Sequence, residues 1–182
     1  MYWVLEQDLR IPGQAAVMDV PDDFNILDWM SGRVIQPPPR EMVLTLRQGS
    51  ADYRGDIISG VVTLFSEELI ESLTKFGVDN IQHFDVELKD PISGEIEYGY
   101  SLVNIVGLIA CVDSDVGEMA PLDRPTSLER FSIDISKTRD VPIFRLQESP
   151  RLILISDQLH DFLVKQKTVG VRMRKTEEYT VW

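Results

Sequence analysis

The sequence predicts an α+β fold with mixed, mostly antiparallel sheets and few helices, forming a single domain over residues 1–182. The main observation is that the pattern of residues 62–88 recurs ninety residues later, at 152–173, so that two similar strand–helix–strand units are expected. The second is a series of short apolar runs separated by turn-forming residues, which is typical of strands. With 43% hydrophobic residues, the chain can also fill a sizeable core.

The first unit, residues 62–88, begins with a predicted strand that ends at Ser66. Serine is a good helix N-cap, and Leu69 and Leu73 follow at helical spacing. Gly77 supplies the helix stop, after which the chain is expected to return as a strand.

The second unit, residues 152–173, repeats this arrangement. Ser156 is the expected N-cap, and Leu159 and Leu163 form the expected buried face of the helix. Lys165 suits the C-terminal end of a helix, where the macrodipole favours a cation. The shared positions are therefore a cap, core leucines and a terminal lysine, which indicates a duplicated scaffold.

The rest of the chain is expected to supply further strands and irregular segments. Residues 11–40 and 48–60 are rich in Pro, Gly, Ser and Asp, and they are predicted to be loops. Residues 98–112 predict one long bent strand or two strands, with Gly107 at the bend. Additional strands are predicted at 2–5, 42–46, 131–135 and 143–146.

The charge of the chain is strongly acidic, with 18 Lys and Arg against 30 Asp and Glu, a formal net charge of −12. Residues 1–91 account for −9 of this charge. Such a balance argues against nucleic acid, since phosphate binding needs Lys and Arg. It suits a basic protein partner through electrostatic steering, although solubility alone also explains it.

The sequence contains one cysteine, Cys111, in an apolar run where it is expected to be a small buried hydrophobe. The first residues lack the basic start and apolar stretch of a signal peptide. No run approaches the roughly 18 apolar residues of a membrane span. These features predict a cytoplasmic protein with no membrane partner.

A search for catalytic or metal-binding motifs finds none, so no cofactor is expected. His83 and His160 have no metal-ligand spacing, and His160 is interpreted as a solvated helical residue. Asn104 lies in an apolar run, where it is expected to tie neighbouring backbone together or to contact a ligand. Arg145 is expected to face outward or to pair with an acid such as Glu148.

Two acidic regions remain, one in the early loop and one in the linker after Cys111. Solvated loops explain them, and an acidic face for a basic partner is the sharper interpretation. Trp29 or Trp3 is a candidate anchor if exposed, and either is equally compatible with the core. The predicted binding residues are Asp22, Asp23, Asp28, Trp29, Asp113, Asp115 and Glu118.

Three ordered groups of residues carry a family resemblance. They are Ser66…Leu69…Leu73…Gly77-Val-Asp-Asn80-Ile-Gln82, then Tyr100-Ser-Leu-Val-Asn104-Ile-Val-Gly107 with Val112-Asp113 and Ile143-Phe-Arg-Leu146-x-Glu148-Ser-Pro150, and finally Leu154-Ile-Ser156…Leu159…Leu163…Gly170-Val171. Together they resemble the Myxococcus-type immunity proteins of bacterial polymorphic toxin systems, formerly a domain of unknown function. The resemblance covers roughly residues 55–175, and residues 1–54 match more loosely.

The resemblance implies a non-enzymatic cytoplasmic antitoxin. Such a protein binds the toxin of a cognate effector, often one delivered by type VI secretion, and so protects the producing cell in bacterial competition. Every matching element is a packing pattern, so no catalytic residue carries over. Two alternatives stay open: a carboxylate-dependent enzyme that uses Asp113 and Asp115, and a homo-oligomeric scaffold such as a homodimer paired through a sheet edge.

Overall fold

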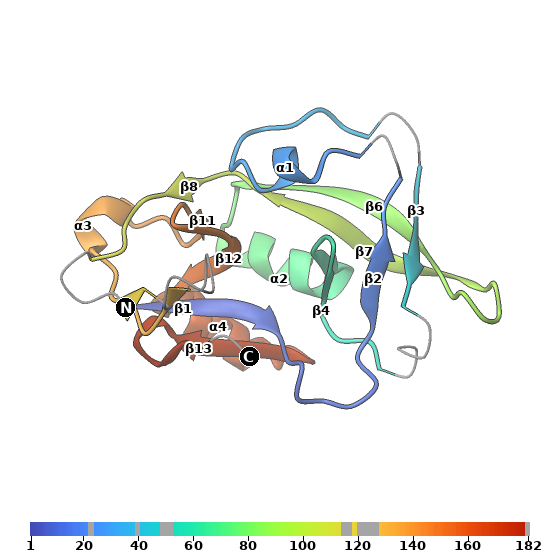
Figure 1. Ribbon diagram of the computed structural model, residues 1–182. Coiled ribbons are helices and arrows are strands. Elements are labelled where there is room, and N and C mark those ends of the chain that lie inside the picture. Colours follow the sequence, from blue (N-terminus) through green and yellow to red (C-terminus); the bar gives the residue numbers. More distant parts are fainter. Residues whose placement is uncertain (22–23, 39–40, 48–52, 114–117, 120–127, 181–182) are drawn as a thin grey trace.

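The computed structural model describes residues 1–182 apart from 22–23, 39–40, 48–52, 114–117, 120–127 and 181–182. The described residues form an open sheet, a closed barrel and a two-stranded ribbon, together with helices (Figure 1). Most neighbouring strands are antiparallel, so the predicted mixed α+β fold is confirmed. No helix in this part of the chain is long and apolar enough to cross a membrane.

The open sheet lies at the left of Figure 1. Its five described strands are, in spatial order, β13 (Val171–Lys175), β1 (Tyr2–Gln7), β12 (Ser149–Ser156), β11 (Ile143–Leu146) and β8 (Leu108–Ile109). β8 runs parallel to β11, and the other neighbours are antiparallel. The predicted strands near both ends of the chain are confirmed, and β1 pairs with a neighbour on each side.

The closed barrel lies at the right of Figure 1. Its described strands, in order around the barrel, are β2 (Ala16–Asp19), β3 (Met42–Leu46), β6 (Ile81–Lys89), β7 (Ile96–Ile105), β5 (Leu64–Ser66) and β4 (Ile57–Gly60). The parallel pair of β2 and β4 closes it. Fully buried side chains such as Leu44, Leu64 and Leu88 fill the interior, so the barrel is packed rather than hollow.

The two predicted helices form as the sequence indicates. α2 (Glu67–Phe76) and α4 (Asp157–Gln166) begin after Ser66 and Ser156. The Ser66 hydroxyl accepts from the Leu69 N–H at 3.1 Å, and the Ser156 hydroxyl accepts from the Leu159 N–H at 3.3 Å. These caps satisfy N–H groups that the first helical turn leaves unpaired, which fixes where each helix starts. Both predicted strand–helix–strand units are therefore confirmed.

Several short elements differ from the sequence predictions. α1 (Ile26–Trp29) and β2 lie in the segment predicted to be irregular, and β4 lies in a predicted loop. The strand predicted at 131–135 is wrong, because Asp134 instead caps α3 (Ile135–Thr138). The remaining described elements are the ribbon of β9 (Glu118–Met119) and β10 (Leu128–Glu129) and the 3-10 helix η1 (Thr176–Glu178).

The two helices share one hydrophobic cluster between the sheet and the barrel. Leu69 and Leu73 enter it from α2, and Leu159 and Leu163 enter it from α4; these leucines are at most 1% exposed. The sheet contributes side chains of β1, β11 and β12, and the barrel contributes side chains of β4, β5 and β7. The duplicated helices therefore join the open sheet to the barrel, because the apolar side chains of each are buried against those of the other.

The duplication extends beyond the segment visible in the sequence. Ile57 pairs with Phe65 in β4–β5, and Ile143 pairs with Ile155 in β11–β12. The Ser66 N–H donates to Asp56 O and the Ser156 N–H donates to Pro142 O, both at 2.9 Å.

The outer strands follow the same scheme. β5 lies beside β7, which pairs with β6, whereas β12 lies beside β1, which pairs with β13. β2 runs parallel to β4, as β8 does to β11. β1, the first described strand, thus completes the second unit, and β3 is the additional barrel strand that pairs with both β2 and β6.

The two units are interlocked by side chains at their turns. The Asn80 side-chain amide, from the turn before β6, donates to Val106 O at 2.9 Å and to Ile143 O at 2.8 Å. Asp56 accepts from the Ser66 hydroxyl at 2.7 Å and from the Val169 N–H at 2.6 Å, which ties β4 to the turn before β13. The start of each returning strand is therefore bonded to the other unit.

Two smaller predictions about residues 98–112 are confirmed. Gly107 separates β7 from β8, and its N–H donates to Gly32 O at 2.9 Å. Asn104 is fully buried, and its side-chain amide donates to Arg33 O and to the Gln82 side chain, both at 2.8 Å. Asn104 therefore holds the segment after α1 against the barrel, which is the structural role expected of a buried amide.

Candidate functional site

The residues predicted to bind a partner do not form one patch within the described structure. Asp28 is exposed on α1 beside the barrel, whereas Asp113 is half-buried after β8, where its N–H donates to Ser132 O at 2.9 Å. Glu118 lies in β9 opposite Glu129. Figure 1 shows α1 and the β8–α3 region on different parts of the molecule. Three predicted residues lie outside the described residues: Asp22, Asp23 and Asp115.

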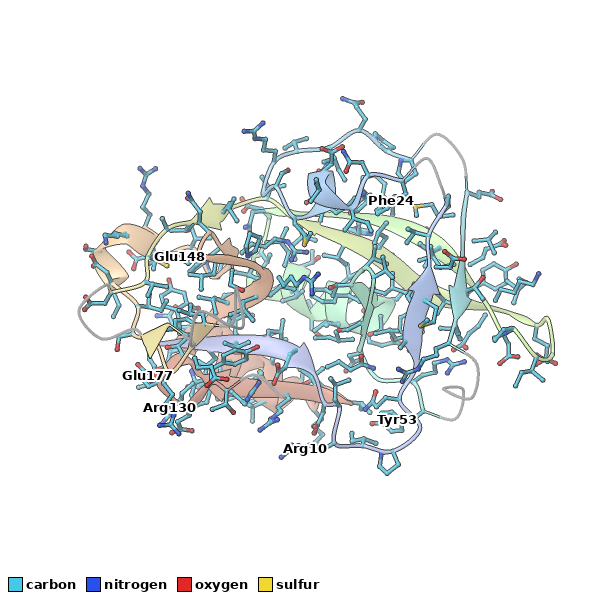
Figure 2. All side chains as sticks on the ribbon, in the orientation of Figure 1. Arg10, Phe24, Tyr53, Arg130, Glu148 and Glu177 are labelled. Carbon is cyan, nitrogen blue, oxygen red and sulfur yellow. The ribbon has the colours of Figure 1, made fainter. Side chains whose placement is uncertain are left out.

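Neither candidate tryptophan is an exposed anchor. Trp29 is 7% exposed and packs into the barrel core, stacked on Phe24 at 5.0 Å between ring centroids and edge-on to Phe84. Figure 2 labels Phe24 beside α1. Trp3 stacks on His160 at 3.8 Å, and its indole N–H donates to Asp157 at 2.9 Å. Trp29 is therefore a core residue, and His160 is partly covered rather than fully solvated.

A cavity of about 430 Å³ lies beside α1. It is lined by residues of the segment from Pro21 to Met42, with Trp29 as part of its wall and Asp28 as its one described carboxylate. A pair of carboxylates, as an acid–base enzyme uses, is thus absent from the described lining. Among the described residues, no three His, Cys, Asp or Glu side chains gather closely enough to hold a metal ion.

The β6–β7 hairpin carries the clearest candidate for a partner-binding surface. Residues 81–98 contain five acidic side chains and one lysine, a formal charge of −4. The hairpin extends beyond the rest of the barrel at the right of Figure 1. Its turn is ordered by Asp90, which accepts from the N–H groups of Ile92 and Ser93 at 2.8 and 2.7 Å. The acidic segment is therefore a shaped protrusion.

A bulge in β7 turns an aromatic side chain of this hairpin outward. Val86 pairs with Tyr100, but Leu88 pairs with Glu97, so β7 has one extra residue at this point. Gly99 supplies the left-handed backbone, with φ of 92°, that such a bulge requires. Tyr98 consequently lies on the outer face, whereas Tyr100 points into the barrel core.

The outer face carries apolar side chains among acids. Tyr98 is 66% exposed, and its hydroxyl donates to Glu87 at 3.3 Å; the Glu87 charge is the main cause of the raised pKa of Tyr98. Val43 of β3 lies opposite Glu87 and is 44% exposed. We call this surface the hairpin face and define it by Val43, Asp85, Glu87, Ile92, Ile96 and Tyr98.

The hairpin face was not among the residues predicted from the sequence. Its acids belong to no recognised binding motif, and its apolar residues alternate like those of any half-buried strand. One signal was readable: Gly99 inside a strand pattern often marks a bulge. Without the pairing register, that signal does not say on which face Tyr98 lies.

Arg145 departs from its prediction. It neither faces outward nor pairs with Glu148, because it is 4% exposed and its guanidinium donates to Pro150 O at 2.9 Å. Glu148 instead accepts from the Val112 N–H at 3.0 Å, on the β8 side of the molecule (Figure 2). Burial lowers the pKa of Arg145 to about 10. The strand places Arg145 on the same side as Ile143, toward the barrel.

Comparison with known proteins adds no family to this description. No protein-family model matches the chain, and no curated protein matches it. Inference about function therefore rests on the residues themselves.

Proposed function

We propose that this protein is an immunity protein, a non-enzymatic cytoplasmic antitoxin that binds and neutralises the toxin of a cognate secreted effector. The hairpin face carries the proposal, because it combines exposed apolar side chains with surrounding carboxylates on a protruding, ordered hairpin. Interfaces are commonly built in this way, with an aromatic anchor inside a polar rim. The family resemblance over residues 55–175 supports the same class of protein.

The partner that fits this surface is a protein with a basic face. Tyr98 offers a large side chain near the centre of the hairpin face, and Asp85 and Glu87 supply negative charge beside it. Acidic residues around Tyr98 accelerate association with a basic protein and disfavour binding of acidic proteins. Binding would neutralise the toxin by covering its active site or an essential surface, so the antitoxin needs no chemistry of its own.

Co-expression tests the proposal. The product of the adjacent toxin-like gene is expressed in bacteria with and without this protein, and growth and complex formation by size exclusion are measured. Rescue of growth together with a stable complex is the expected result. Persistent toxicity alongside abundant soluble protein would reject the function, as would a neighbouring product that is not toxic.

Variants of the hairpin face identify the surface. Tyr98→Ala should weaken toxin binding by roughly 30-fold, the value for loss of about 2 kcal/mol at an aromatic hot spot. Glu87→Lys should slow association and change its salt dependence. Leu27→Ala and Glu177→Lys serve as matched controls, because both residues are exposed away from the hairpin. Equal effects of Tyr98→Ala and Leu27→Ala would remove the hairpin face from the interface.

The linker and scaffold interpretations are tested in the same samples. Joint reversal of Asp113 and Asp115 to Lys should leave toxin affinity unchanged if the hairpin face is the interface. A large loss would move the interface to the linker. Light scattering at low concentration distinguishes a monomer from a homodimer, and a stable homodimer without toxin binding would favour the scaffold.

A further inference from the structure

A groove of about 590 Å³ lies between the barrel and the open sheet. One wall comes from β2, β4 and the chain up to Thr63, a second from α1, and a third from β11 and β12. Its floor and sides are mainly apolar. The apolar lining residues are Ala16, Val17, Met18, Ile26, Trp29, Met30, Val61, Val62, Leu102 and Val103.

Three arginines line the same groove, Arg47, Arg145 and Arg151, and the other polar side chains are the hydroxyls of Ser59 and Thr63. No acidic residue belongs to the described lining. This composition is unusual in a chain whose formal net charge is −12. Arg145 and Arg151 therefore give the described lining of the groove a positive character.

Arg145 is the most informative of the three. One terminal nitrogen of its guanidinium donates to Pro150 O. Its Nε atom is buried and has no hydrogen-bond partner among the described residues. Burial, with no carboxylate to offset it, lowers the pKa of Arg145. A buried cation without a counter-ion is unfavourable, so an anion bound beside Arg145 would be stabilised by it.

Arg151 supplies the accessible charge. It lies on β12, one residue after the Pro150 carbonyl that Arg145 contacts, and its side chain is exposed. An anion entering the groove thus meets an exposed guanidinium before a buried one. The bond to Pro150 uses one terminal nitrogen of Arg145, and a guanidinium has further donors of the kind that bind a carboxylate.

We propose that this groove binds a small amphipathic carboxylic acid, with the carboxylate between Arg145 and Arg151 and the apolar body against the accessible side chains of Met18, Met30 and Val61. The volume lies in the range of small-molecule sites, and a few polar groups among apolar walls are typical of such sites. The groove is concave and formed by two layers of the fold, so it suits a small ligand better than a flat protein surface. This inference does not depend on toxin binding.

Octanoate is the probe for the test, with binding followed by calorimetry and by intrinsic fluorescence, to which Trp29 in the groove lining contributes together with Trp3 and Trp182. Octanoate should bind with a dissociation constant below about 1 mM, within the limits for a ligand of this size. Octanol should bind at least about tenfold more weakly, because loss of a charge-assisted hydrogen bond has effects of that order. Equal affinity for octanol, or no binding of octanoate at millimolar concentration, would overturn the proposal.

Arginine variants locate the head group. Arg151→Gln should weaken octanoate roughly tenfold without affecting folding, since the residue is exposed. Arg145→Met, which preserves the length of the side chain, should abolish binding; circular dichroism verifies its fold. Arg130→Gln is the matched control, because Arg130 is exposed and outside the groove lining.

Two outcomes would reject the assignment even if octanoate binds. Unchanged affinity in Arg151→Gln would place the carboxylate elsewhere. Tighter binding of octyl phosphate than of octanoate would assign the head group to phosphate rather than to a carboxylate. The expected order is octanoate, then octyl phosphate, then octanol.

Discussion

Truncation of one core leucine in α2 or α4 should destabilise the whole protein by a similar amount. Leu69 is 1% exposed and Leu159 is 0% exposed, and both belong to the cluster shared by the sheet and the barrel. Leu→Ala removes three buried side-chain carbons, roughly 2.4 kcal/mol at about 0.8 kcal/mol each, and adds a cavity term, for a total of about 2–5 kcal/mol. We expect about 3 kcal/mol for each variant.

Urea unfolding followed by circular dichroism measures this loss. For a domain of this size, 3 kcal/mol corresponds to a decrease in melting temperature of roughly 6–12 °C. Val164→Ala, also on α4 but 53% exposed, is the matched control and should change stability by less than about 0.5 kcal/mol.

Hydrogen exchange then tests whether the two halves unfold together. Because the cluster draws residues from both halves, Leu69→Ala should lower the opening free energy of α4 as much as that of α2. A loss of less than about 1 kcal/mol for Leu69→Ala, below the range for a buried leucine, would contradict a shared core. Early exchange of α2 with unchanged protection of α4 would also contradict it.

Three further predictions follow from individual contacts. Asp56→Ala removes the acceptors of Ser66 and Val169 and should cost about 2 kcal/mol in urea unfolding, against little change for exposed Asp79→Ala. Burial raises the pKa of Cys111 to about 12, so a thiol reagent at pH 8 should label it only after unfolding; labelling of the native protein would contradict its burial. Hydrogen bonds from Arg10 lower the pKa of Asp8, so this carboxylate stabilises the fold above its unfolded pKa of about 3.9 and loses that effect as pH falls through the folded pKa. The stability difference between the protein and Asp8→Asn should therefore shrink below about pH 4; a constant difference would exclude the ion pair as its cause.

The parts of the fold that the sequence predicted are those with local causes. Ser66 and Ser156 cap their helices because a hydroxyl three residues before a leucine N–H satisfies it without help from the rest of the chain. Gly107 interrupts an apolar stretch between two strands for an equally local reason. These signals lie within a few residues of the structure they determine.

The errors have two physical causes: a local side-chain cap that overrides an alternating pattern, and pairing between strands that are distant in the sequence. Residues 131–135 alternate like a strand, yet the Asp134 side chain accepts from the Ser136 N–H at 3.1 Å and a short helix follows. β2 and β4 are each four residues long, and it is their parallel pairing with each other that closes the barrel. The sequences of β2 and β4 do not indicate that these two strands pair with each other.

The candidate sites were less predictable than the fold. Acidic residues were identifiable, but the orientation of Tyr98 depends on a one-residue change of register between β6 and β7. Arg145 has apolar neighbours on both sides, and its burial depends on how the barrel packs against the sheet. Sites formed where two units meet cannot be derived from either unit alone.

The position of β1 has a consequence for how the protein folds during synthesis. β1 is made before its partners β12 and β13, which are among the last described strands in chain order. All described strands of the barrel have been synthesised by the end of β7. The barrel can therefore form before β12 and β13 are available to pair with β1. An apolar strand without partners is prone to mispairing, so a nascent-chain chaperone that shields residues 2–7 should raise the yield of folded protein.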